Sequence, residues 1–482
     1  MAERLTPLDA AFLGFETPAA PMHVGGLLVL DGRPATGGEP DVVRVLRHVR
    51  ARLASVPRIR QRVLPLPLAA HRPVWVDDPD FDPRRHIRRA RLPAPGTREV
   101  LVRAAAQLHG EMLPRDRPLW QVTLFEGLDD GSLAIYAKLH HSMVDGLAAV
   151  GLALQVFDVD PEAPLDTTYA EPPRGAPLPG RAELLSGALQ EQRAFAGAAV
   201  RAAARAVPGP AEAWRRLAAV SPGGALGSLA SGLRPAPRSP LGIRVGEGRR
   251  AELFTVPLAA AKQVKAELGF TVNDVVLAAV AEGLYEFLRH RGPVAAGATH
   301  RIAVPVNTRG EADSGALGNR VSAVLVDLPV GPMDPVRRLW YVAEAMGALK
   351  RKGSAQGGER LLELTAFLPA PLHSVATRAL ADRQWLFNLI VSNVPGVQFP
   401  LYCAGHRVRE IYPLLPLTPN AGVTICVLSY DNRLNFGLVA DARGVPDAHV
   451  LRRGIESGFT RLLDAAFGRD ADEAATGPAM TR

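Results

Sequence analysis

The chain has 482 residues, of which 47% are hydrophobic and 22% charged, so its length predicts two domains and its composition excludes a globally disordered protein. The 56 lysines and arginines outnumber the 48 aspartates and glutamates, and the net charge is +8. This charge suits an anionic surface or substrate, but an aromatic content of 6% without a basic-aromatic pattern argues against a nucleic-acid-binding protein.

Cysteine usage and the N-terminus indicate the compartment. Cys403 and Cys426 do not form a CxxC pair, so we expect no disulfide and a reducing environment. Residues 1–14 lack the apolar run and cleavage site of a secretory signal. No apolar stretch reaches the roughly 18 residues that a membrane-spanning helix needs. We therefore expect a cytoplasmic protein, and any contact with a membrane would be peripheral.

Residues 1–160 alternate strand and helix patterns and form the first predicted domain. In the first helix Val43, Leu46 and Val49 share one face. The turn at residues 129–131 joins two strand patterns into a hairpin. Strands are predicted at residues 22–30, 120–125 and 132–140, and helices at residues 41–55, 98–112 and 147–157.

Residues 161–245 differ in composition, because proline, glycine, alanine and arginine dominate them. We interpret this segment as a crossover between domains that contains helical pieces. Apolar residues from Leu185 and Leu189 to Val207 roughly follow one helical face, with arginines elsewhere. Such a basic amphipathic helix could lie on a lipid surface or pack between the two domains.

Residues 246–468 return to alternating strands and helices and form the second predicted domain, so the fold class is α/β in two layered domains. Thr271 and Asp274 have the spacing of a capping box. Residues 469–482 are small and polar and are predicted to be a disordered tail. Helices are predicted at residues 257–268, 272–291, 334–349 and 448–465, and strands at 301–306, 321–328, 385–392, 423–428 and 434–439.

The segment His140-His141-Ser142-Met143-Val144-Asp145-Gly146 follows the strand predicted at residues 132–140. Adjacent side chains at a strand end point in opposite directions, so only one of the two imidazoles can face a given cavity. The other is then a buried support. Asp145 can cap the following helix or pair with a base, and Gly146 permits close backbone approach.

A neutral imidazole is suited to removing a proton from an attacking hydroxyl near neutral pH. The alternatives for this segment are two structural histidines with a capping aspartate, or a metal site. The metal site is disfavoured because adjacent histidines diverge and no third histidine or HExxH spacing follows. Ser142 lacks the GxSxG context of a nucleophile. Residues 246–251 fit a dinucleotide fingerprint nominally, but neither a clear strand nor a helix flanks them.

The chain resembles the bacterial wax ester synthase/diacylglycerol acyltransferases, long-chain members of the HHxxxDG CoA-dependent acyltransferase superfamily. The resemblance covers most of the chain in the same order, apart from the crossover and the tail. One departure is Val397, where a proline often stands in the family. Besides HHxxxDG, the matching segments are Leu5–Ala10, Met22–Gly26, Pro118–Trp120, Asn273–Ala278, Leu317–Arg320 and Val391–Gly396.

The resemblance implies two chloramphenicol-acetyltransferase-like domains joined by a helical crossover, with the active site in a channel between them. It implies that His141 is the general base and that His140 and Asp145 support it. It also implies acyl-CoA as the donor substrate, diacylglycerol or a long-chain alcohol as the acceptor, and neither a cofactor nor a metal. Residues expected to contact substrate are Gly146, Asn273, Asp274, Ser392 and Asn393.

Each of these motifs also has a structural explanation. Trp120 can be a core residue, and Asn273 and Asp274 can cap the helix that they begin. A helix N-terminus facing the channel could instead stabilise an oxyanion or a phosphate. Ser392 and Asn393 can simply form the turn before Pro395-Gly396.

Two other functions fit the same sequence. One is a related acyltransferase that takes its acyl group from a carrier-protein thioester and acts on a non-lipid acceptor. The other is a catalytically silent protein that coats lipid droplets. The intact HHxxxDG segment argues against the silent protein.

Overall fold

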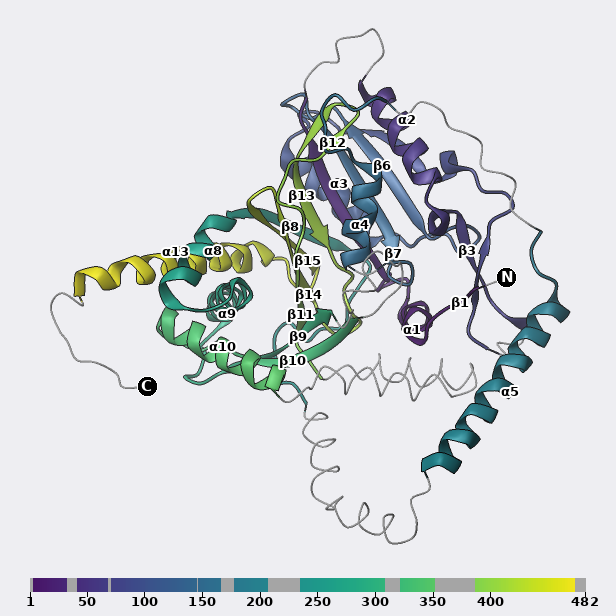
Figure 1. Cartoon of the computed structure of the whole chain (residues 1–482). Helices are drawn as coiled ribbons and strands as arrows, with labels where there is room; N and C mark the ends of the chain where they lie inside the picture. Colours follow the sequence, from purple (N-terminus) through teal and green to yellow (C-terminus); the bar gives the residue numbers. More distant parts are fainter. Residues whose placement is uncertain are drawn as a thin grey trace.

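Two six-stranded sheets covered by helices form the body of the molecule, and a three-stranded sheet lies beside the first of them (Figure 1). This computed structural model describes residues 3–32, 41–67, 71–144, 146–165, 177–206, 235–307, 321–351 and 386–472. The small sheet has the order β1-β4-β3, in which β1 is Glu3–Arg4, β4 is Val74–Asp77 and β3 is Gln61–Leu64.

The first large sheet has the strand order β12-β13-β2-β7-β6-β5, and only its β5–β6 pair is parallel. Its strands are β2 (His23–Leu30), β5 (Ile87–Arg91), β6 (Trp120–Glu126), β7 (Leu133–His140), β12 (Tyr402–Cys403) and β13 (His406–Leu414).

Period-two alternation gives the first sheet two apolar faces. Leu28 and Ile135 pack towards α2 (Asp41–Ala54) and α4 (Gly146–Val156). Leu27 and Tyr136 pack towards α3 (Arg98–Gly110) on the opposite face. The short helices η1 (Pro57–Arg60) and η3 (Pro83–Arg85) precede β3 and β5.

Two strands of the first sheet come from the C-terminal part of the chain. β13 pairs with β2 in antiparallel register, with Tyr412 opposite Leu27 and Leu414 opposite Gly25. The predicted boundary at residue 246 therefore does not separate the two sheets, since residues on its C-terminal side contribute strands to both of them. The reason is that residues 402–414 complete the edge of the first sheet, which local periodicity cannot reveal.

The second large sheet has the order β10-β9-β11-β14-β15-β8, with parallel pairs on both sides of β11. Its strands are β8 (Arg249–Pro257), β9 (Thr299–Asn307), β10 (Val321–Pro329), β11 (Leu389–Val394), β14 (Val423–Tyr430) and β15 (Arg433–Asp441). The helices that cover it are α8 (Leu258–Leu268), α9 (Val272–Arg291), α10 (Pro335–Arg351) and α13 (Ala448–Asp472).

Helix α9 is the centre of the second core, where α8, α10 and α13 surround it in Figure 1. Residues 275–281 are apolar all round and at most 1% exposed, which is the pattern of a fully buried helix. The predicted capping box is confirmed, because the Thr271 hydroxyl accepts the Asp274 amide and Asp274 accepts the Thr271 amide.

The predicted crossover contains α5 (Arg181–Ala206), which packs on the small sheet. Leu184 and Ala188 are buried against Leu66, Val74 and Val76. Leu185 and Leu189 are exposed, so in the described part of the helix they do not pack between the domains. Contact of this exposed face with a lipid surface stays a prediction.

The other predicted elements are confirmed within a few residues, and two ends differ. The strand predicted at residues 385–392 is β11 at Leu389–Val394, and residue 385 lies outside the described residues. The tail predicted from residue 469 is helical as far as Asp472, because a single Gly468 does not end a helix of otherwise good helix formers.

Candidate active site

An apolar cavity of about 580 Å³ lies between the two large sheets. This volume is typical of ligand sites, which range from about 300 to 1,000 Å³. Both sheets contribute to its wall, and so do α1 (Pro7–Phe15) and α4. The cavity occupies the place of the channel expected between the domains. Lining residues include Phe12, Val24, Ala137, Ala149, Ile390 and Leu428.

His141 is the one histidine among the described residues that line this cavity. Its ring lies flat against Phe12 of α1, with the two ring centroids 4.1 Å apart. Its backbone N–H donates to the carbonyl oxygen of Met22 at 2.8 Å. The preceding amide, of His140, donates to the carbonyl of Leu119 at 2.9 Å, so the Pro118-Leu119-Trp120 segment holds the end of β7.

The His140 side chain is fully buried and points away from the cavity, as the strand geometry predicts. Its Nδ1 lies 2.8 Å from the Ser142 hydroxyl and accepts the Ser142 amide at 3.1 Å. Its Nε2 lies 3.4 Å from Oε1 of Glu16. Burial lowers the pKa of His140 despite the neighbouring carboxylate, so the ring is neutral at neutral pH.

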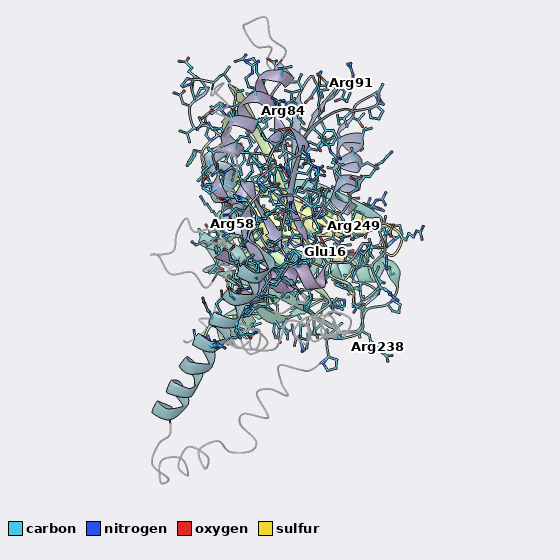
Figure 2. The ribbon with its side chains drawn as sticks, turned by 90° about the vertical axis from the view of Figure 1, so that its right-hand side faces the viewer. Glu16, Arg58, Arg84, Arg91, Arg238 and Arg249 are labelled. Carbon is cyan, nitrogen blue, oxygen red and sulfur yellow. The ribbon has the colours of Figure 1, made fainter. Side chains whose placement is uncertain are left out.

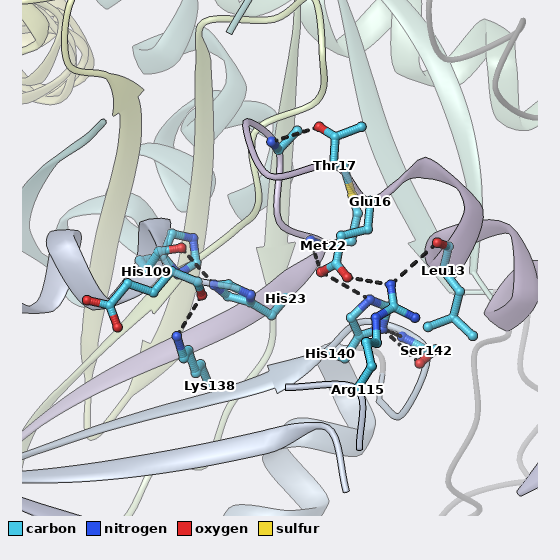
Figure 3. Close-up of polar contacts among 12 residues, drawn as sticks. Leu13, Glu16, Thr17, Met22, His23, His109, Arg115, Lys138, His140 and Ser142 are labelled. Carbon is cyan, nitrogen blue, oxygen red and sulfur yellow. Dashed lines mark hydrogen bonds and ion pairs between the residues drawn. The ribbon is translucent and has the colours of Figure 1, made fainter. Parts of the chain in front are cut away.

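Glu16 is a buried carboxylate that follows α1 directly and has three partners. It accepts the Met22 amide at 3.0 Å, faces His140 and forms an ion pair with Arg115 (Figure 3). Burial alone would raise the pKa of Glu16. The nearby His140 ring, the charge of Arg115 and the Met22 amide outweigh it and lower this pKa to about 2. Because His140 is itself neutral, we assign the ionised state of Glu16 chiefly to Arg115 and the amide.

A second buried polar group lies between the first sheet and α3. Lys138 donates to the carbonyls of Leu108 and Glu111, both at 2.7 Å, at the C-terminal end of α3, where a cation is favourable (Figure 3). Burial lowers the pKa of Lys138 to about 8. His23 bonds to the carbonyl of His109, and burial lowers the pKa values of both histidines. His23 and His109 lie behind the cavity wall, whereas Lys138 is part of the lining.

Two side chains that could act as nucleophiles are unsuited to that role. Ser142 is 1% exposed, and its hydroxyl faces His140 and not the cavity. Cys426 lines the cavity, but burial raises the pKa of its thiol to about 12, so the thiolate is absent at neutral pH. Neither Ser142 nor Cys426 is therefore suited to form a covalent enzyme intermediate.

Gly146 and Ser392 both line the cavity, from opposite halves of the molecule. Gly146 begins α4 at the point where β11 approaches it, and a Cβ there would lie 2.9 Å from Cγ2 of Val394. Ser392 is in β11, opposite Cys426 of β14. Their contact with substrate stays a prediction, but the structure places both where a bound molecule would reach them.

Asn273 and Asn393 meet each other: the Asn393 amide donates to the side-chain oxygen of Asn273 at 3.2 Å. This bond ties the N-terminus of α9 to β11. Asp274 is 7% exposed and accepts the Thr271 amide and hydroxyl at 3.0 and 2.6 Å, so capping accounts for it. Neither Asn273 nor Asp274 is among the residues that line the cavity. Their substrate contact stays a prediction.

The sequence also singled out Asp145, residues 317–320, Trp120 and Val397. Asp145 lies outside the described residues, as does the segment at residues 317–320. Trp120 is a core residue, because its indole N–H donates to Ile59 and its ring stacks on His86, although it also reaches the cavity. Val397 lines the cavity, and its carbonyl accepts the amide of Asp431 at 3.0 Å.

Sequence reasoning missed Phe12 and Glu16, although it singled out the segments on either side of them. A signal was present for Glu16, which is the single charged residue between Asp9 and His23. A lone carboxylate in an apolar segment is expected to be paired if it is buried. Phe12 carries no such signal, because an aromatic residue on an apolar helix is ordinary core.

The arginines that are labelled in Figure 2 lie in different parts of the molecule. Arg84 and Arg91 lie at one end of the view in Figure 2, Arg238 lies at the other, and Glu16 projects near the middle. Among the described residues, no group of three or more His, Cys, Asp or Glu side chains could hold a metal ion. The helices in the described ranges include none long and apolar enough to cross a bilayer.

Comparison with known families gives two matches along the chain. Residues 5–276 match the wax ester synthase/diacylglycerol acyltransferase catalytic domain, and residues 317–463 match the WS/DGAT C-terminal domain. Two similar proteins of Mycobacterium tuberculosis H37Rv are named as probable diacylglycerol O-acyltransferases. One is 35% identical over 466 residues, covering 95% of both chains, and the other is 32% identical, covering 96% of this chain and 99% of its own.

Solved structures show the same fold. The wax ester synthase/diacylglycerol acyltransferase of Marinobacter aquaeolei VT8 has a TM-score of 0.67 and 26% identity, covering 96% of this chain and 99% of its own. The first condensation domain of the calcium-dependent antibiotic synthetase has a TM-score of 0.59 at 19% identity, covering 99% and 98%. The predicted architecture of two related α/β domains is confirmed.

Proposed function

The chain belongs to the wax ester synthase/diacylglycerol acyltransferase family and is an acyltransferase of that family, and from this premise we propose that His141 is the general base of the reaction. The substrates that we propose are a long-chain acyl-CoA as donor and the hydroxyl of diacylglycerol or of a long-chain alcohol as acceptor. The products are then triacylglycerol or a wax ester, together with free CoA.

The observation that supports this proposal is the position of His141, whose imidazole lines an apolar cavity between the two sheets. An apolar wall suits an acyl chain and a lipid acceptor, since both bury hydrocarbon there. The described lining of the cavity contains no carboxylate that could act as the base, and the imidazole of His141 can take that role. Glu16, the buried carboxylate beside His140, does not line the cavity and is paired with Arg115.

The reaction needs one proton to move twice. His141 accepts the proton of the acceptor hydroxyl while the oxygen attacks the thioester carbonyl and a C–O bond forms. The tetrahedral intermediate carries a negative oxygen, which hydrogen-bond donors at the site must stabilise. The C–S bond then breaks, and the imidazolium of His141 gives its proton to the departing thiolate. His140 and Asp145 support the base in this scheme.

The site of action that we propose is the surface of a membrane or of a lipid inclusion, because the acceptor is insoluble in water. The exposed Leu185 and Leu189 on α5 support peripheral contact of this kind. We propose no cofactor.

The experiment that tests this function is thiol release from palmitoyl-CoA by purified protein with diolein, hexadecanol or no acceptor. Acceptor-dependent release supports the proposal and ranks the two acceptors. If folded protein releases no thiol with either acceptor, the proposed function is contradicted. A carrier-protein thioester should then be tried as donor, and lipid-surface binding without any release would indicate a silent coat protein.

A further inference from the structure

We propose that Glu16 is a positioning residue for His141, because one buried carboxylate contacts both chain segments that hold this histidine. The inference rests on the function proposed above, in which His141 is the base. Glu16 does not reach the cavity, so it acts through its neighbours and not on substrate.

The first connection passes through Met22. Oε1 of Glu16 accepts the Met22 amide at 3.0 Å, and the carbonyl of Met22 accepts the His141 amide at 2.8 Å. Two hydrogen bonds thus link the carboxylate to the backbone of the base. The segment from Thr17 to Met22 joins α1 to β2, so the carboxylate also fixes where this loop enters the sheet.

The second connection passes through the His140 ring. The Ser142 amide donates to Nδ1 of His140, so Nδ1 is an acceptor and the ring hydrogen of the neutral tautomer is on Nε2. That hydrogen faces Glu16, whose Oε1 is 3.4 Å from Nε2. With Nδ1 held by Ser142 and Nε2 facing Glu16, the ring fixes the turn that follows β7, from which the His141 side chain projects.

The negative charge of Glu16 matters for this arrangement. Arg115 pairs with the second carboxylate oxygen, and the lowered pKa of Glu16, about 2, keeps the group ionised at neutral pH. Oε1 serves both the Met22 amide and the Nε2–H of His140, while the other oxygen serves Arg115. A glutamine that turns its single oxygen to the Arg115 cation places its NH₂ group against both of the other donors. Glu16→Gln therefore loses both connections or, in the opposite orientation, the ion pair.

A purely structural ion pair would also lower stability when it is removed, so stability alone cannot test the proposal. The matched control is Glu282, another buried carboxylate, which pairs with Arg338 at 2.8 Å. Glu282 lies among α9, α10 and α13, away from the cavity. If Glu16 only stabilises the fold, Glu16→Gln and Glu282→Gln should have the same effect on turnover per folded molecule.

The measurement is kcat and KM for palmitoyl-CoA with saturating acceptor, at a temperature where urea unfolding shows each variant to be folded. We expect Glu16→Gln to lower kcat on the order of 10- to 100-fold, as expected when a catalytic group is misplaced by a fraction of an ångström or more. KM should stay within roughly twofold, because Glu16 contacts no substrate. Glu282→Gln should keep the wild-type kcat. Equal kcat values for the two variants would overturn the proposal.

A double variant shows whether Glu16 acts through His141. If it does, Glu16→Gln added to His141→Ala should leave the residual turnover of His141→Ala unchanged, since there is no base left to position. A further loss equal to that of the single variant would refute this route. Wild-type turnover in His141→Ala alone would instead contradict the proposed function. If Glu16→Gln fails to fold, Ser142→Ala removes the hydroxyl contact at Nδ1 of His140, which loosens the same ring, and it should show the same non-additivity.

Discussion

The imidazole of His141 lies flat against the phenyl ring of Phe12, with ring centroids 4.1 Å apart and ring planes 9° apart. Phe12 comes from α1, whose start is fixed by Pro7 and by a capping box between Thr6 and Asp9. The N-terminal helix thus supplies one wall for the histidine, and the loop that follows it supplies the hydrogen bond to its backbone. The orientation of the base depends on a segment more than a hundred residues away in sequence.

The stacking predicts the effect of Phe12→Leu, which keeps an apolar side chain but removes the flat ring surface. An aromatic contact is worth about 0.5–1.5 kcal/mol, so we expect kcat to fall roughly 2- to 10-fold as the imidazole gains rotational freedom. Phe15→Leu is the control, because Phe15 also lines the cavity from α1. That variant should change KM more than kcat. An unchanged kcat in Phe12→Leu would show that the stack does not orient the base.

The contact between Gly146 and Val394 predicts a second effect. A Cβ at residue 146 would lie 2.9 Å from Cγ2 of Val394, so Gly146→Ala should overpack the junction of α4 with β11. Such overpacking costs about 1–3 kcal/mol, measurable as a lower urea midpoint. Adding Val394→Ala to Gly146→Ala should recover most of the lost stability. The control is Gly151→Ala in the same helix, where nothing lies within 4 Å, and it should be neutral or slightly stabilising.

The capping box at the start of α9 predicts that Asp274 contributes to stability. Asp274→Ala should lower the free energy of unfolding by about 0.5–2 kcal/mol, and Thr271→Ala, which removes the other half of the box, should do the same. If Asp274 acts only through the cap, the two variants should change kcat and KM for acyl-CoA equally. A loss of kcat/KM in Asp274→Ala without a matching loss in Thr271→Ala would show that Asp274 contacts substrate.

The pKa of His109 predicts how stability depends on pH. Burial lowers this pKa from 6.5 to about 3, so between these values the unfolded chain binds a proton that the folded protein does not. The free energy of unfolding must therefore decrease as the pH falls from about 6.5 towards 3, by up to about 1.4 kcal/mol per pH unit for this group. His109→Gln should show a shallower decrease in urea unfolding at pH 7, 6, 5 and 4. Exposed His449 provides the control as His449→Gln. Equal slopes in all three proteins would contradict the assignment.

Much of the local structure could be predicted because periodicity and capping are local signals. The alternation from Leu133 to His140 predicted both the strand and the divergence of His140 from His141, and both are confirmed. The capping box of Thr271 and Asp274 is likewise visible in four residues. The family resemblance then predicted a channel between the domains, and a cavity is found there.

The rest depends on contacts between distant residues. Nothing in the sequence near Tyr412 shows that β13 joins β2 in the first sheet, because either sheet could accept an apolar strand. The position of Phe12 against His141 is a contact of the same kind. Glu16 was within reach of sequence reasoning as a lone charge in an apolar segment. Its partner Arg115 could not be identified before the fold brought the two residues together.

The most direct test of the role of His141 is a single-turnover measurement of product ester, with labelled palmitoyl-CoA bound first and acceptor added in excess. Wild type, His141→Ala and, as a control, His449→Ala on the exposed start of α13 should bind palmitoyl-CoA equally. We predict that the rate of ester formation falls on the order of 10²- to 10⁴-fold in His141→Ala, the range of general-base catalysis, and is unchanged in His449→Ala. Ester formation at the wild-type rate in folded His141→Ala would contradict the account.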